Sequence, residues 1–164
     1  MAEARTLEAG KERHSRATAP RKRSLGNVRQ KDPVGEAECW MKRAIRLRNG
    51  NVRKAIRAAE TSAGYYLAAS KKSFSERMGA NCLVSAGRAL SLAASLCERM
   101  DARRAGRMHE DAGDYLFRGA RGGTMPEASV RELAKAEYEQ ALGLGGVQRI
   151  LERKVAMCER SSGM

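Results

Sequence analysis

Seven basic residues between positions 42 and 57 are the side chains of this sequence most able to do chemistry. No acidic residue interrupts them. Guanidinium and ammonium groups at this density bind phosphates or carboxylates through charge-assisted hydrogen bonds, and added salt weakens such contacts. The alternative interpretation is an ordinary solvated helix face. The Lys42–Arg57 cluster consists of Lys42, Arg43, Arg46, Arg48, Arg53, Lys54 and Arg57.

A second group could in principle support catalysis. His109 is followed by Glu110, Asp111 and Asp114, and a histidine beside carboxylates is a common acid–base pair. Asp111 and Asp114 lie about one turn apart on a segment with the pattern of an amphipathic helix, where a solvated face is the simpler interpretation. We therefore predict no catalytic residue and a protein that is not an enzyme.

The cysteines and glycines predict no metal site and no cofactor. The cysteines form no C-x-x-C pair, and each falls within an apolar helical pattern, which is typical of small buried side chains in a reducing compartment. The glycine-rich stretch 143–147 precedes a helix but follows no strand and lacks the lysine of a phosphate-binding loop, so we expect a helix–helix turn. The cysteines are Cys39, Cys82, Cys97 and Cys158.

Length and charge narrow the class of protein. The chain has 164 residues, enough for about one domain, and 32 basic against 19 acidic residues give a net charge of +13. This excess favours an anionic partner, although a basic bias of the whole proteome is the alternative. The most apolar stretch, 82–97, is broken by Arg88, and no apolar signal begins the chain, so we expect no transmembrane segment and a cytoplasmic location.

The elements that must position these side chains begin near residue 35. Residues 1–34 are polar and basic and contain Pro20 and Pro33, which predicts a disordered tail. Residues 35–164 show apolar positions at helical spacing and no convincing strand, which predicts an all-α domain of about six helices. The expected boundary signals are Gly50 with Asn51, a Ser73–Glu76 capping box opening a helix over 74–99, Asp101, the stretch 119–123, and Pro126 in the first turn of the helix that follows.

Two short patterns alternate along the helical part. Ala/Cys-x-x-x-Φ-x-x-Ala-Ile/Leu-x-Leu, where Φ is loosely apolar, begins at Ala37, Cys82 and Ala134. Ala-Gly-x-Tyr-Leu occurs at 63–67 and at 112–116. The recurrence predicts repeated helix pairs.

Small residues within these patterns predict close packing. Ala44, Ala89 and Ala141 would let a neighbouring helix approach. Gly64 and Gly113 each cost roughly 1 kcal/mol of helix propensity relative to alanine. Their matched placement therefore predicts two points where helix backbones nearly touch.

These patterns resemble tetratricopeptide-type helical hairpins, and more closely the SNAP-like repeats of the soluble attachment proteins of vesicle fusion. The likeness spans about residues 36–160 and is clearest at 110–118 and 136–142. The copies are 45 and 52 residues apart, against roughly 34 in tetratricopeptide units. The resemblance implies antiparallel helical hairpins stacked as a short solenoid that binds proteins, and a plain helical bundle is the alternative.

The expected function follows from charge and fold together. We predict a non-enzymatic scaffold or adaptor of tetratricopeptide-like type that binds an acidic protein through the Lys42–Arg57 cluster. The alternative is a nucleic-acid-associated basic helical protein. A homodimer is expected to use the last helix, with Ile150, Leu151 and Val155 as its seam.

Overall fold

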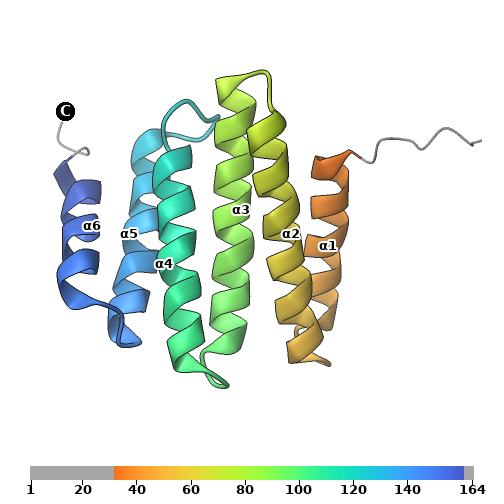
Figure 1. Cartoon of the computed structure of the whole chain (residues 1–164), viewed down its shortest axis with the longest axis horizontal. Helices are drawn as coiled ribbons and strands as arrows, with labels where there is room; N and C mark the ends of the chain where they lie inside the picture. Colours follow the sequence, from red (N-terminus) through yellow and green to blue (C-terminus); the bar gives the residue numbers. More distant parts are fainter. Residues whose placement is uncertain (1–31, 161–164) are drawn as a thin grey trace, which may run out of the picture.

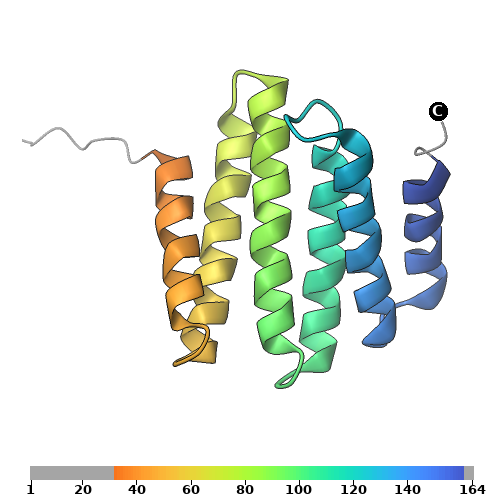
Figure 2. The same cartoon turned by 180° about the vertical axis from the view of Figure 1, so that it is seen from behind.

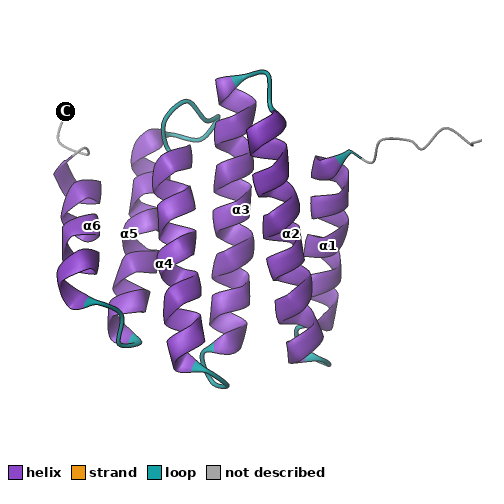
Figure 3. Ribbon diagram, in the orientation of Figure 1, coloured by secondary structure: helices purple, strands orange, loops and turns teal. Residues whose placement is uncertain are grey.

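The computed structural model describes residues 32–160, and their regular structure is entirely helical. Six helices follow one another without a strand in this part of the chain, joined by short loops (Figure 3). Each helix packs on its neighbours in the chain, and adjacent helices run in opposite directions (Figure 1). The helices are α1 (Pro33–Leu47), α2 (Val52–Lys72), α3 (Glu76–Cys97), α4 (Ala102–Gly119), α5 (Glu127–Gly143) and α6 (Gln148–Arg160). The predicted all-α fold is confirmed.

The predicted tail of residues 1–34 lies outside the described residues except at its end. There the Asp32 side chain accepts hydrogen bonds from the backbone N–H groups of Val34 and Gly35, and α1 begins at Pro33. Proline suits this first position because its missing N–H has no partner in the helix anyway.

Two predicted helix starts are confirmed by their caps. The Asn51 side chain accepts a hydrogen bond of 3.0 Å from the Lys54 N–H at the start of α2. Asp101 accepts one of 2.8 Å from the Arg104 N–H at the start of α4. Both bonds satisfy an N–H group that has no partner within its helix.

The Ser73–Glu76 capping box was a wrong prediction. Helix α3 begins at Glu76, with Ser75 at its N-cap and no side-chain cap. The Ser73 hydroxyl instead bonds both the N–H and the carbonyl of Ser75. Only a few residues separate α2 from α3. The Ser73 hydroxyl therefore stabilises the tight turn between them and is not available to cap α3. Pro126 likewise precedes α5 as its N-cap and does not lie inside the first turn.

Polar contacts link alternate helices across the row. Arg104 on α4 pairs with Glu60 on α2 at 2.5 Å, and Lys154 on α6 pairs with Glu110 on α4 at 2.8 Å. Seen from behind, α1, α3 and α5 lie in front of α2 and α4, so the odd-numbered helices form the opposite side of the row (Figure 2). The even-numbered helices are therefore tied together by ion pairs on one side of the row.

The core is built largely from alanine. One cluster of buried side chains spans α1 to α4, and a second spans α3 to α6. Ala44, Ala89 and Ala141 are fully buried, which confirms that these repeat positions are packing points. Leu151 is also fully buried, so it belongs to this core and is unavailable to the expected dimer seam, whereas Ile150 is exposed.

The two matched glycines have different surroundings. A Cβ at Gly113 would lie 2.5 Å from Cε1 of Tyr138, so Gly113 is a point of close packing, but its neighbour is an aromatic ring and not the helix backbone that was predicted. Gly64 is exposed and a Cβ there would meet nothing within 4 Å, so that prediction is wrong. In the preceding copy of the repeat the position of Tyr138 is held by Ala86, which has no ring to reach across.

Helix α3 qualifies by length and composition as a membrane span, which the broken apolar stretch around Arg88 did not lead us to expect. It is the one such helix in residues 32–160, and half of its apolar window is buried inside the fold. It packs between α2 and α4. A buried core helix passes the same test of length and hydropathy.

Candidate functional site

The Lys42–Arg57 cluster lies at the end of the molecule formed by the turn between α1 and α2. All seven side chains are exposed. Lys42 and Arg46 are four residues apart on α1, as are Arg53 and Arg57 on α2, so each pair shares one side of its helix. The remaining three, Arg43, Arg48 and Lys54, flank these pairs close to the turn.

The positive charge of this cluster is not neutralised within the described part of the chain. None of its members forms an ion pair with a carboxylate in residues 32–160. Glu60, the first acidic residue after the cluster, is engaged by Arg104. The cluster therefore presents guanidinium and ammonium donors that an external anion can reach.

One member of the cluster is held in place by an aromatic ring. The Arg43 guanidinium lies over the Trp40 ring, 5.0 Å from its centroid. Trp40 itself is half-buried and packs against the first core cluster. The contact restricts the Arg43 side chain, which remains exposed.

The carboxylates that bond His109 are not the ones that follow it in the sequence. Its ring is 2% exposed, and its Nδ1 lies 2.7 Å from Glu137 on α5. Its Nε2 lies 3.1 Å from Glu98 at the end of α3, and Ser91 donates to the second oxygen of Glu137. The histidine thus connects α4 with α5 and with the end of α3, and its ring is buried.

These contacts determine the charge of His109. Burial lowers the pKa of the imidazole and is the largest single influence on it. The hydrogen bonds to Glu137 and Glu98, together with the charges of both carboxylates, outweigh burial and raise the His109 pKa above its ordinary value. The two carboxylates therefore stabilise the protonated form of the buried ring.

The two aspartates predicted to share a solvated face also differ. Asp111 is exposed as expected, but Asp114 accepts a hydrogen bond of 2.8 Å from the hydroxyl of Tyr138 and pairs with Lys154 at 2.7 Å. Burial opposes the charge of Lys154, yet its hydrogen bonds to Asp114 and Glu110 raise the pKa of the ammonium group. These polar groups satisfy one another and connect α4, α5 and α6.

The cysteine prediction holds for three residues and is wrong for one. Cys82, Cys97 and Cys158 are buried, whereas Cys39 is exposed on α1. Its position on the helix turns it away from Ala37 and Ala44, the two buried residues of α1. No group of His, Cys, Asp and Glu side chains in the described residues is arranged to hold a metal ion.

The difference in exposure predicts selective thiol chemistry. Burial raises the pKa of Cys82 and of Cys97, and it raises that of Cys158 to about 11, so these thiols remain protonated near neutral pH. In the native protein an aromatic disulfide reagent is expected to modify Cys39 rapidly and the other three only after unfolding. Mass spectrometry of the modified peptides measures this order. Early labelling of a second cysteine would contradict it.

Comparisons with known proteins identify no relative of this chain. No family model matches it, and neither a curated protein nor a solved structure is significantly similar to it. A functional assignment therefore rests on the geometry and charge described above.

Proposed function

We propose that this protein is a non-enzymatic scaffold or adaptor that binds an acidic segment of another protein at the Lys42–Arg57 cluster. The observation that carries the proposal is the exposure of all seven basic side chains with no ion-pair partner in residues 32–160. Arginine predominates in the cluster, and its planar fork matches a carboxylate through two parallel hydrogen bonds.

The proposed architecture for this role is a short stack of three helical hairpins, of the tetratricopeptide-like or SNAP-like type. Support comes from the repeat positions Ala44, Ala89 and Ala141, which are buried on alternate helices. The ion pairs Glu60–Arg104 and Glu110–Lys154 each join one even-numbered helix to the next, α2 to α4 and α4 to α6. Stacks of this kind present extended surfaces to protein partners.

The absence of an enzymatic role is part of the proposal. Its support is that His109, the one described histidine, is enclosed by carboxylates of its own fold, and that Lys154 and Asp114 neutralise each other. A catalytic group must reach its substrate, and these groups are committed to contacts between helices.

Binding of a fluorescent peptide rich in Asp and Glu tests the proposal. The Arg53→Gln/Arg57→Gln variant is expected to bind it roughly tenfold more weakly, because each exposed ion pair contributes up to about 1 kcal/mol. Lys71→Gln/Lys72→Gln is the matched control, since it removes the same charge from exposed positions at the other end of α2. Fluorescence anisotropy at about 150 mM salt measures both affinities, and higher salt should weaken binding.

Three outcomes of this experiment would overturn the proposal. Equal loss in both variants would mean that only the net charge matters. No loss in either would place the peptide elsewhere. Tighter binding of a DNA or RNA duplex than of the peptide at the same salt would favour the nucleic-acid alternative.

The variant is expected to stay folded. Arg53 lies in the first turn of α2, where its positive charge is unfavourable beside the positive end of the helix dipole, so its replacement should not unfold the helix.

A further inference from the structure

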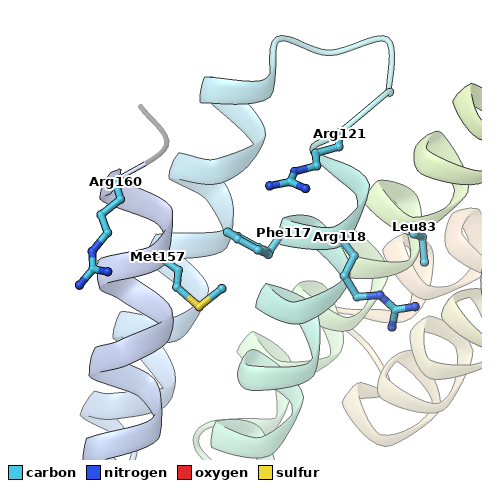
Figure 4. Close-up of a pocket in the computed structure, with 6 residues that line it drawn as sticks. All are labelled: Leu83, Phe117, Arg118, Arg121, Met157 and Arg160. Carbon is cyan, nitrogen blue, oxygen red and sulfur yellow. The ribbon is translucent and has the colours of Figure 1, made fainter. Parts of the chain in front are cut away.

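A pocket opens between α4 and α6 at the end of the molecule opposite to the α1–α2 turn (Figure 4). Its volume is about 630 Å³, within the range of small-molecule sites. Three apolar and three basic side chains line it, and no acidic one does. They are Leu83, Phe117, Arg118, Arg121, Met157 and Arg160.

The apolar part of the pocket lies between the two helices. Phe117 from α4 and Met157 from α6 point toward each other, and Arg121 projects from the loop after α4 over the same gap (Figure 4). A smaller recess of about 140 Å³ shares Phe117 and Met157 with this pocket and is also lined by Tyr138. Met157 is 51% exposed, so an apolar ligand would cover surface that is now in contact with water.

The basic side chains of the pocket have no carboxylate partner within the described residues, although the Arg118 guanidinium lies over the Tyr115 ring, 5.9 Å from its centroid. Arg118, Arg121 and Arg160 are exposed and form no ion pair in residues 32–160. The acidic groups nearby are engaged elsewhere: Lys154 binds Asp114, and Lys135 binds Glu159.

A buried arginine packs behind the apolar wall of the pocket. The Arg131 guanidinium lies over the Phe117 ring, 5.0 Å from its centroid. It pairs with Glu127, yet its Nη1 is buried without a hydrogen-bond partner. The ring that forms the apolar wall of the pocket therefore has a guanidinium stacked on it.

We propose that this pocket binds a small amphipathic carboxylate. The aliphatic chain would lie between Phe117 and Met157, and Arg121, which projects over that gap, would hold the carboxylate. The guanidinium groups of Arg118 and Arg160 point away from the gap in the free protein, so one of them would rotate toward the bound carboxylate (Figure 4). A purely polar anion would leave the apolar wall exposed, and a neutral chain would leave the guanidinium groups without a partner. The site is separate from the Lys42–Arg57 cluster, so its failure would not affect the function proposed above.

Titration of the full chain with decanoate, below the concentration at which it forms micelles, tests this site. Decanoate is expected to bind at least tenfold more tightly than decan-1-ol, which lacks the charge, or acetate, which lacks the chain. Calorimetry measures the affinities, and amide shifts in a ¹H–¹⁵N spectrum locate the site. The shifts should fall at the end of α4 and along α6, not around the α1–α2 turn.

Two variants separate the contributions of charge and chain. Arg121→Gln/Arg160→Gln should weaken decanoate roughly tenfold and leave decan-1-ol unchanged, since two charge-assisted contacts are lost. Met157→Gln should weaken both ligands. Lys71→Gln/Lys72→Gln is the control for net charge and should bind decanoate normally. All of these positions are exposed, and unchanged circular dichroism confirms that each variant is folded.

Four results would overturn the proposal. The first two are equal affinity for decanoate and decan-1-ol, and amide shifts confined to the Lys42–Arg57 cluster. The third is an unchanged decanoate affinity in Arg121→Gln/Arg160→Gln. The fourth is displacement of decanoate from the pocket by the acidic peptide at a peptide concentration below that of decanoate. The last result would assign the pocket to a protein segment.

Discussion

Gly113→Ala is expected to destabilise the protein by about 1–3 kcal/mol, the range for adding a carbon to a closely packed site. The new Cβ would lie 2.5 Å from Cε1 of Tyr138. That ring cannot move aside easily, because it is 2% exposed and its hydroxyl is bonded to Asp114. The clash outweighs the gain in helix propensity that alanine brings.

Gly64→Ala is the matched control and is expected to change stability in the opposite direction. It makes the same substitution in the same repeat motif, but the new Cβ would meet nothing within 4 Å. Only the propensity gain of up to about 1 kcal/mol remains. Urea unfolding followed by circular dichroism measures both variants. Gly113→Ala with unchanged or increased stability would show that the helices can separate at no cost.

Glu137→Ala is expected to cost about 3 kcal/mol or more, the effect of removing one partner of a buried ion pair. Glu137 is the closer of the two carboxylates around His109, at 2.7 Å, and its own side chain is 14% exposed. The substitution also leaves the Ser91 hydroxyl without its acceptor. Glu132→Gln, an exposed change on the same helix, removes one charge too and should be near neutral.

The same network makes the free energy of unfolding depend on pH. The His109 pKa is raised in the folded state, so the imidazolium is bound more tightly there than in the unfolded chain. Its contribution is complete below the unfolded value of about 6.5 and is lost as pH rises through the higher folded pKa. Urea unfolding of the wild-type protein should therefore show falling stability over that interval, and Glu137→Ala should reduce the fall. An equal fall in both proteins would exclude His109 as its source.

Local features of the fold could be predicted from the sequence, because their partners lie within one turn. Asn51 and Asp101 cap their helices through N–H groups three residues away. Ala44 and Ala141 are buried where helical spacing places them. Ser73 shows the limit of such local signals, since a turn competed for the same hydroxyl.

The polar network and the pocket depend on residues far apart in the sequence. Glu137 is 28 residues from His109, and Lys154 is 40 residues from Asp114, so no spacing within one helix could indicate these pairs. The pocket joins Phe117 and Met157 from separate helices in the same way. The space around a glycine also depends on the facing helix, which is why Gly113 and Gly64 differ although both occupy the same position of the motif.

The order of helix contacts determines how the molecule opens. Because each helix packs mainly on the ones before and after it, cooperativity along the row passes through one interface at a time. Within residues 32–160 the outer helices α1 and α6 each have one such interface, so they can fray while α3 and α4 keep their amide protons protected from exchange. Both proposed sites include a terminal helix, and ligands that bind there would reduce fraying at the two ends of the row.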